Sequence, residues 1–314
     1  MDTVSPTTVR ELRSVVITGA SRGLGLASAT LLYKQGWRVV AAMRSPEAGL
    51  ERLRASTGAA ADHRRLIGVR LDLDDASSIS AAAKTIEEAV GAPDVVVHNA
   101  GIAAAGSVEE TPSEVWERLF RTNLFGPVQL TKELLPSMRA AGRGRIIVVS
   151  SVGAIRGMPS ISTYSASKGA LERWAEALAE EIAPFGIGVT ILVSGTFKTD
   201  ILTEQTPEYG DHNGPYAVHR DGIHRTGGLA VRLASSPERF ARALARFIDE
   251  RAPFARHAVG IDARLLLLGS RVLPGRLLHH VIRLAMHLPR HGALQDRLRD
   301  RIDHSPSEES GQHG

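Results

Sequence analysis

Three observations predict an α/β fold built on a single Rossmann-type, doubly wound parallel sheet with helices on both faces. Short runs rich in Val and Ile recur along roughly the first two thirds of the chain and alternate with helical patterns. Continuous apolar runs of this kind are typical of parallel strands that are buried on both faces. A glycine-rich loop follows the first run and opens a helix, which is the usual place for a phosphate in such sheets.

The predicted strands and helices follow one another in a regular order. Strands are expected at Ser14–Gly19, Trp37–Met43, Leu66–Leu73, Asp94–Gly101, Arg145–Ser151 and Gly188–Gly195. Helices are expected at Gly23–Gln35, Ala76–Val90, Ser113–Ala141 and Tyr164–Ala183. Pro184 and Gly186 end the last of these helices. Strands that alternate with helices in this way favour the doubly wound arrangement.

The pattern changes after Thr199. Thr203–Gly228 is polar and has no strong period, and its length favours a lid or a mobile loop over an ordinary connection. Pro237–Glu250 has a helical pattern, and Arg264–Leu288 is apolar with basic residues at intervals. We therefore divide the chain into an N-terminal arm (1–13), a cofactor-binding and catalytic domain (14–254) with a substrate loop near 199–233, a basic and apolar C-terminal helical extension (255–304) and a disordered tail (305–314).

Composition excludes several classes of function. The chain has 314 residues, 43% of them hydrophobic and 23% charged, as in globular proteins. It has no cysteine, which excludes disulfides, thiol nucleophiles and cysteine zinc sites, and its histidines show no metal-ligand pattern. The N-terminus lacks a signal-peptide pattern, and no apolar run approaches the roughly 20 residues that span a bilayer. We expect a cytoplasmic protein without a metal.

The positive charge is confined to the C-terminal part of the chain. The net charge is +4, whereas Ala255–Asp303 alone contains nine Arg and four Asp, a balance of +5. A nucleic-acid-binding face would combine basic residues with aromatic ones, and aromatic residues make up only 4% of this chain. We therefore expect no nucleic acid as a partner.

The loop Thr18–Gly25, with the sequence TGASRGLG, predicts a dinucleotide site. Its three glycines allow a tight turn and close approach of the backbone to a phosphate, and the following helix offers free N–H groups. The second predicted strand ends with Arg44 where an acid would bind an unphosphorylated ribose, and Arg22 lies in the loop itself. Two guanidinium groups suit a 2′-phosphate, so NADP(H) is preferred. Alternatively, Arg44 is solvated and Glu47 binds the ribose of NAD(H).

Together with several later motifs, this loop resembles the short-chain dehydrogenase/reductase family over about Val15–Thr199. The loop matches T-G-x(3)-G-x-G, and Tyr164-x-x-x-Lys168 matches the catalytic Y-x(3)-K pair. The resemblance implies a catalytic set of Asn123, Ser151, Tyr164 and Lys168. It implies cofactor contacts from Thr18, Gly19, Ser21, Arg22, Gly23, Leu24, Gly25, Arg44, Asp72, Leu73, Asn99, Ala100, Gly101, Tyr164, Lys168, Gly195 and Thr199.

Two residues depart from the family pattern. His98 stands where asparagine is usual, and we interpret it as a packed, hydrogen-bonded residue at a strand end. Ser194 replaces the usual proline before Gly195, which bears on how the nicotinamide carboxamide is held. The run AAMRSPE and the extended C-terminal region are similar to members that act on retinoids, steroids and related lipophilic alcohols or ketones.

Tyr164 and Lys168 lie one helical turn apart, so their side chains are neighbours. Carbonyl reduction needs a hydride from the nicotinamide and a proton, which Tyr164 can donate. A free phenol titrates near 10, and the ammonium of Lys168 is expected to lower the pKa of Tyr164. The family pattern implies that Lys168 also binds the nicotinamide ribose. The hydroxyl of Ser151 would reach the substrate oxygen, and Asn123 would hold a helix open for a water that returns protons.

The sequence leaves alternatives open. An isolated Tyr/Lys pair is usually a surface pair and an isolated Ser after a strand is usually a cap, but together they predict an NADP(H)-dependent oxidoreductase that interconverts a carbonyl and an alcohol. The alternatives are a non-catalytic dinucleotide-binding sensor or scaffold, or a Rossmann-like epimerase or dehydratase. Apolar residues at helical spacing after Pro274 predict a helix that packs on the domain or lines a lipophilic pocket, makes a peripheral membrane contact, or binds a partner. The resemblance also implies a homodimer or homotetramer.

Overall fold

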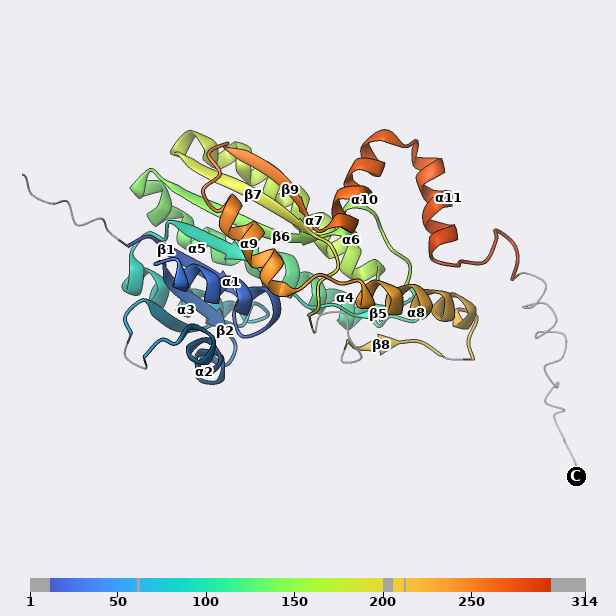
Figure 1. The fold of residues 1–314 in the computed structure, drawn as a ribbon, viewed down its shortest axis with the longest axis horizontal. Helices are drawn as coiled ribbons and strands as arrows, with labels where there is room; N and C mark the ends of the chain where they lie inside the picture. Colours follow the sequence, from blue (N-terminus) through green and yellow to red (C-terminus); the bar gives the residue numbers. More distant parts are fainter. Residues whose placement is uncertain (1–11, 61–62, 200–205, 212, 295–314) are drawn as a thin grey trace, which may run out of the picture.

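A seven-stranded parallel sheet lies between two layers of helices in the computed structural model, which describes residues 12–60, 63–199, 206–211 and 213–294 (Figure 1). The strand order is β3-β2-β1-β4-β6-β7-β9, and every neighbouring pair is parallel. The strands are β1 (Ser14–Thr18), β2 (Arg38–Met43), β3 (Leu66–Arg70), β4 (Val95–His98), β6 (Gly144–Ser151), β7 (Ile187–Ser194) and β9 (Phe254–Val259). The predicted fold class is confirmed.

The helices divide between the two faces of the sheet. They are α1 (Gly23–Lys34), α2 (Pro46–Thr57), α3 (Ala76–Val90), α4 (Ser113–Phe120), the π-helical turn η1 (Arg121–Phe125), α5 (Gly126–Ala141), α6 (Val152–Ile155), α7 (Ser162–Ile182), the 3-10 turn η2 (Ala183–Phe185), α8 (Ala217–Arg232), α9 (Pro237–Phe247), α10 (Ile261–Val272) and α11 (Gly275–Ala285). The short strands β5 (Ala105–Gly106) and β8 (Glu208–Tyr209) form a separate parallel pair.

Alternating strand residues supply the two halves of the core. On one face, Val16 and Val40 pack in a cluster with buried side chains of α3, α5 and α7. On the other face, Val15 and Val39 pack with buried side chains of α1, α2 and α9. Because both faces are covered, the strands are apolar at consecutive positions, which is why their runs of Val and Ile were visible in the sequence.

The sheet extends past residue 254. Phe254–Val259 forms β9 and pairs with β7 along its whole length, so the first residues assigned to the helical extension belong to the sheet. This edge strand was not predicted because its sequence, FARHAV, mixes charged and apolar residues and most of its side chains are only half-buried. Helix α2 was also missed, because its sequence is polar and only Gly49 and Leu53 of its residues are buried.

The segment after β7 is more regular than its sequence indicated. The predicted loop Thr203–Gly228 contains β8 and most of α8, whose helical period is obscured by glycines and charged residues. The predicted C-terminal helix is present as α11, and Pro274 is its N-cap residue. The N-terminal arm up to residue 11, residues 200–205 and 212 of the substrate loop, and the tail 305–314 lie outside the described residues. Among the helices that the structure describes, none is both long and apolar enough to cross a bilayer.

Candidate active site

The loop between β1 and α1 has a backbone that only glycine fits. Gly19 and Gly23 have positive φ angles of 69° and 56°. A Cβ atom at Gly25 would lie 2.3 Å from the carbonyl oxygen of Gly19, so a side chain there would push the loop apart. The turn therefore brings backbone N–H groups at the start of α1 to the carboxyl edge of the sheet, where a phosphate binds in folds of this type.

Thr18 fixes this loop to the end of β4. Its buried hydroxyl accepts hydrogen bonds from the backbone N–H groups of Asn99 and Ala100, both at 3.0 Å. The side-chain amide of Asn99 donates in return to the carbonyl oxygen of Thr18 at 2.9 Å. The predicted cofactor residues of β1 and β4 are thus brought together, with Thr18 bracing the loop from within the core.

A cleft of about 500 Å³ runs along the carboxyl edge of the strands. Its lining includes most of the residues predicted to bind the cofactor: Gly19, Ser21, Arg22, Gly23, Leu24, Arg44, Asp72, Leu73, Asn99, Ala100, Gly101 and Thr199. Gly195 lies apart from them, against the carboxylate of Asp262, where a Cβ atom would collide with the Asp262 carboxylate. Arg44 is exposed at the tip of β2, and the lining includes Arg44 but not Glu47.

A larger hollow of about 840 Å³ lies at the opposite, amino-terminal edge of the strands, lined by residues that include Ser14, Asp94 and Arg145. Its charged side chains are partly paired with one another, as in the Arg143–Asp94 ion pair. Ligands of open α/β sheets bind at the carboxyl edge, and the chemically equipped residues lie there. We therefore assign the candidate site to the smaller cleft.

Three elements bring the predicted catalytic residues together. Tyr164 and Lys168 lie on α7, Ser151 ends β6, and Asn123 lies in the π-helical turn η1. The hydroxyl of Ser151 lies near enough to the phenol of Tyr164 to lower the pKa of that phenol. Tyr164 packs in one cluster with Ala103, Ala104 and Leu119, which also line the cleft. All four predicted side chains are buried, and none of them lines the cleft itself: Asn123 and Lys168 lie behind Gly101, and Tyr164 behind Ala103 and Ala104.

Burial has the largest effect on the pKa values of Tyr164 and Lys168. It raises the pKa of Tyr164 above its ordinary value, against a smaller lowering by the hydrogen bond from Ser151. The expectation that Lys168 lowers the pKa of Tyr164 is therefore wrong for this structure. The ammonium of Lys168 donates to the backbone carbonyl of Val149 at 3.0 Å. Burial also lowers the pKa of Lys168 to about 8, while the charge of Glu172 acts in the opposite direction.

Asn123 connects α7 to the segment after β4. Its amide oxygen accepts from the N–H of Ile102 at 2.9 Å, and its amide nitrogen donates to the hydroxyl of Ser167 at 3.0 Å. The same nitrogen donates to the carbonyl oxygen of Ile102 at 2.9 Å. The helix widens into a π-helical turn at this residue, and such turns are frequent at functional sites. The predicted long helix Ser113–Ala141 is interrupted here by the π-helical turn, and the role of Asn123 in holding a water stays a prediction.

Glu172 is a buried acid that the sequence analysis missed. It follows Tyr164 and Lys168 at the same four-residue spacing on α7, and its side chain is 1% exposed. Its carboxylate accepts from the hydroxyl of Ser150 at 2.6 Å and from the guanidinium of Arg256 at 2.5 Å. Burial raises the pKa of Glu172. The four-residue spacing could have identified Glu172, but its partner Arg256 belongs to the unpredicted β9.

The two departures from the family pattern have structural explanations. His98 is buried, its Nε2 is hydrogen-bonded to the hydroxyl of Thr131 at 2.8 Å, and burial lowers its pKa to about 3, which keeps the ring neutral. The interpretation of His98 as a packed strand-end residue is confirmed. The hydroxyl of Ser194 donates to the carbonyl oxygen of Ser150 at 2.7 Å and thereby joins the ends of β7 and β6.

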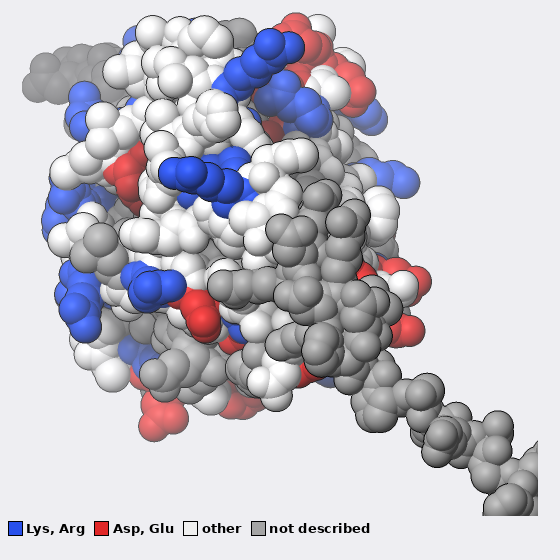
Figure 2. Space-filling model, turned by 90° about the vertical axis from the view of Figure 1, so that its right-hand side faces the viewer, with Lys and Arg blue, Asp and Glu red and all other residues white. Residues whose placement is uncertain are grey.

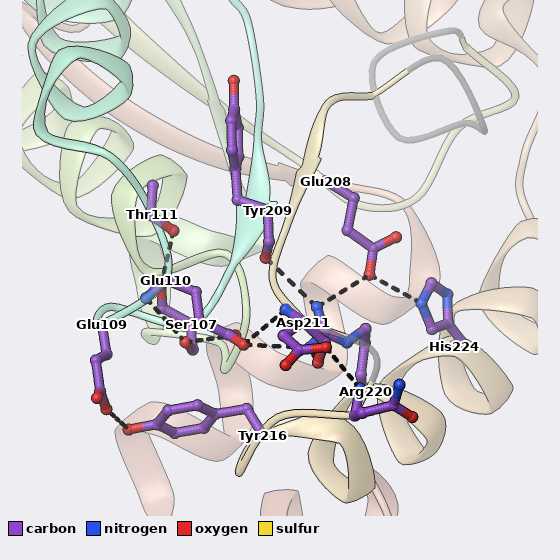
Figure 3. A network of polar contacts seen from close by, with 11 residues as sticks. Ser107, Glu109, Glu110, Thr111, Glu208, Tyr209, Asp211, Tyr216, Arg220 and His224 are labelled. Carbon is purple, nitrogen blue, oxygen red and sulfur yellow. Dashed lines mark hydrogen bonds and ion pairs between the residues drawn. The ribbon is translucent and has the colours of Figure 1, made fainter. Parts of the chain in front are cut away.

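A short segment, Pro207–Asp211, forms the outer wall of the cleft, and we call it the strap. Its strand β8 pairs with β5, and the ring of Tyr209 packs against the cluster that contains Tyr164. The side chain of Arg220, on α8, lies beside the strap and binds its C-terminal end (Figure 3). This guanidinium is buried and donates to the carbonyl oxygen of Asp211 at 2.7 Å and to the carboxylate of Glu110 at 3.3 Å. The ring of Tyr209 points away from this network (Figure 3).

Further contacts extend the network on both sides of Arg220. The carboxylate of Glu110 also accepts from the hydroxyl of Ser107 at 2.8 Å and from the N–H of Asp211 at 3.0 Å. The carboxylate of Glu208 pairs with His224 at 3.1 Å (Figure 3). The strap is therefore bound to the loop after β5 and to α8 by charged groups, although the sequence around it showed no regular pattern.

The sequence matches the short chain dehydrogenase family over residues 13–210. The chain is 31% identical over 275 residues to a 3-ketodihydrosphingosine reductase of Bacteroides thetaiotaomicron, with 86% of this chain and 96% of the relative covered. A short-chain dehydrogenase of Streptomyces avermitilis superposes with a TM-score of 0.73 at 30% identity, over 95% of this chain and 100% of the other.

Two further solved structures contain a nicotinamide cofactor. A metagenomic short-chain oxidoreductase in complex with NADP has a TM-score of 0.61 at 26% identity, over 79% of this chain and 96% of the other. A 3-ketoacyl-(acyl-carrier-protein) reductase of Brucella melitensis complexed with NADH has a TM-score of 0.64 at 27% identity, over 79% and 97%. The chain belongs to the short-chain dehydrogenase/reductase family and is an oxidoreductase with a Rossmann-type fold that binds NAD(P).

Proposed function

We propose that this member of the short-chain dehydrogenase/reductase family is an NADP(H)-dependent reductase of a lipophilic ketone or aldehyde, with Tyr164 as the proton donor. The observation that carries the proposal is the juxtaposition of the buried Tyr164 and Ser151 side chains beside a cleft that is lined by the glycine loop, with its Arg22, and by Arg44. When bound, the cofactor would supply the hydride for the carbonyl carbon.

The chain's own residues account for the proton. A buried phenol with a raised pKa stays protonated at neutral pH, so Tyr164 can donate to the carbonyl oxygen as negative charge develops there. The hydroxyl of Ser151 has a single proton, which would turn from the phenol of Tyr164 to the same carbonyl oxygen as a second donor once the substrate is bound. Lys168 places a positive charge beside Gly101, at the wall of the cleft. Its pKa of about 8 leaves it mostly charged at neutral pH.

The lining near Tyr164 supports an apolar substrate. Ile102, Ala103 and Ala104 line the cleft together with the neighbouring Pro207 and Tyr209, and this part of the lining is largely apolar. Such a surface binds a hydrocarbon group by removing it from water. The relative named 3-ketodihydrosphingosine reductase is named for the reduction of a keto group, which supports the same direction of reaction.

The preference for NADP(H) over NAD(H) is inferred from Arg22 in the glycine loop and Arg44 after β2. Arg22 and Arg44 both line the cleft, and guanidinium groups bind phosphate oxygens in pairs. An NADP-bound and an NADH-bound relative share this fold, so the preference for NADP(H) depends on these two side chains. The alternative is a sensor or scaffold that binds the cofactor without turnover. Such a protein needs only the cofactor site, so this alternative does not explain why Asn123, Ser151, Tyr164 and Lys168 are all present and buried.

The test is consumption of NADPH, with NADH in parallel, over carbonyl compounds that range from small ketones to steroid- and retinoid-sized ones. We expect turnover with NADPH and apolar ketones, and a loss of about 10²- to 10⁴-fold in kcat with the Tyr164→Phe variant. Faster turnover with NADH would contradict the role of Arg22 and Arg44. Binding of NADPH, measured by fluorescence, without turnover of any carbonyl compound would favour the sensor.

A further inference from the structure

Exposed apolar side chains gather on the two C-terminal helices, which project from one end of the molecule (Figure 1). Of the fourteen large apolar side chains that are exposed in the described part of the chain, half lie on α10 and α11. These seven are Ile261, Leu265, Leu268, Val272, Leu277, Val281 and Leu284. Soluble monomeric proteins rarely concentrate exposed apolar surface in this way, and where they do it usually marks a contact. We call the seven residues the apolar stripe.

The apolar stripe follows helical spacing. Its members are three or four residues apart within each helix, so they lie on one face of α10 and one face of α11. The opposite faces of α10 and α11 pack against other parts of the protein. Ala263, Leu267 and Leu278 are buried, and α10 packs against α6 and α11. The packing therefore fixes the outward direction of the stripe, and the described residues leave it uncovered.

Basic side chains accompany the apolar stripe. Between residues 261 and 291 the sequence contains a single acid, Asp262, and five arginines: Arg264, Arg271, Arg276, Arg283 and Arg290. The carboxylate of Asp262 accepts a hydrogen bond from the backbone N–H of Thr196 at 2.6 Å, so it belongs to the junction with the sheet. Figure 2 shows this end of the molecule from outside, with broad white areas interrupted by blue side chains and with red mostly toward the edges.

We propose that α10 and α11 bind reversibly to the surface of an anionic lipid bilayer. An apolar face flanked by arginines is the arrangement of helices that lie in the plane of a bilayer interface, with the apolar residues in the acyl boundary and the basic ones among phosphates. A second copy of this chain fits the surface less well. A two-fold contact would bring two equally basic surfaces together, with Asp262 as the single acid between residues 261 and 291 to offset their arginines.

The experiment is flotation of the full chain with vesicles of phosphatidylcholine alone and of phosphatidylcholine mixed with phosphatidylglycerol. The wild-type chain is expected to float with the anionic vesicles and to be released by salt. Combined Leu265→Ser, Leu268→Ser and Leu284→Ser substitutions remove apolar surface that the fold does not use, and should lower the partition coefficient about tenfold per leucine. Combined Arg264→Gln and Arg276→Gln should lower it about fivefold per arginine.

Matched controls separate this surface from general apolar exposure. Val108→Ser and Leu233→Ser alter exposed apolar residues elsewhere and should leave flotation unchanged. Circular dichroism must show the same fold and melting temperature for all variants. The proposal is overturned if the wild-type chain floats with neither vesicle or equally with both, or if the control variants lose binding as well. It is also overturned if gel filtration shows an oligomer that the leucine substitutions dissociate, since the stripe would then bind a second copy.

Discussion

The two walls of the cleft are built by different means. The cofactor wall is backbone: the glycine loop, the ends of β1 and β4, and a threonine hydroxyl that joins them. The substrate wall is made of side chains: Arg220, Glu110 and their partners hold a two-residue strand in place. Backbone geometry depends on local sequence and tolerates little change, whereas a side-chain network depends on residues far apart in the chain. We therefore expect the cofactor wall to be general and the substrate wall to decide specificity.

The Tyr164→Phe substitution removes the phenol hydroxyl that lies between the cofactor wall and the substrate wall. We expect it to reduce kcat more than any other substitution discussed below. If Tyr164 is the proton donor that we propose, its removal should lower kcat by about 10²- to 10⁴-fold, the usual contribution of general acid catalysis. The dissociation constant for NADPH should change little, since the ring remains. Steady-state kinetics and fluorescence titration measure the two quantities. Tyr216→Phe, which removes an exposed hydroxyl bonded to Glu109, is the matched control and should retain full activity.

Arg44→Gln tests the cofactor wall. Loss of a charge-assisted hydrogen bond to a phosphate costs about 1.5–3 kcal/mol, so the dissociation constant for NADPH should rise roughly ten- to a hundredfold. Affinity for NADH should stay the same. Arg118→Gln serves as the control, because Arg118 also lines the cleft but lies on α4. An equal loss of affinity for both cofactors would show that Arg44 acts on the loop's structure instead of on a 2′-phosphate.

Arg220→Ala tests the substrate wall. The strap loses its donors to Asp211 and Glu110, so we expect KM for large carbonyl substrates to rise about tenfold, equivalent to about 1.4 kcal/mol, with NADPH affinity unchanged. Arg220→Lys keeps the charge and should restore part of the loss. A fall in NADPH affinity of the same size would contradict the separation of the two walls.

Glu172→Gln should give the smallest effect, a change in the pH profile. The charge of Glu172 raises the pKa of Lys168, which burial holds at about 8, so its removal should lower that pKa further. If charged Lys168 supports activity, the alkaline limb of kcat/KM then moves to lower pH, while activity at pH 6 is little changed. The pH profile of the variant against wild type measures the shift. A limb that stays in place would show that Glu172 acts only on stability, through Ser150 and Arg256.

The titration of Lys168 also affects stability. Its pKa is lower in the folded chain than its ordinary value, so between about pH 8 and the ordinary range of lysine the unfolded chain binds more protons. The contribution of Lys168 to the free energy of unfolding therefore rises with pH across that window. Below about pH 8 the buried ammonium of Lys168 lowers the free energy of unfolding. A buried charge that destabilises the fold is typical of residues that are kept for function.

The sequence by itself determined six strands of the sheet, the glycine loop and the placement of Tyr164 and Lys168 on one helix, because each depends on short-range patterns: consecutive apolar residues, glycines at positive φ, and a four-residue spacing. Only the tertiary structure decided the rest. Desolvation by the whole fold, not the neighbouring ammonium, sets the pKa of Tyr164. Arg256 reaches Glu172 only because β9 joins the sheet, and Arg220 reaches Glu110 across 110 residues of sequence. Burial and long-range pairing depend on residues that are far apart in the chain, so a local sequence pattern cannot predict them.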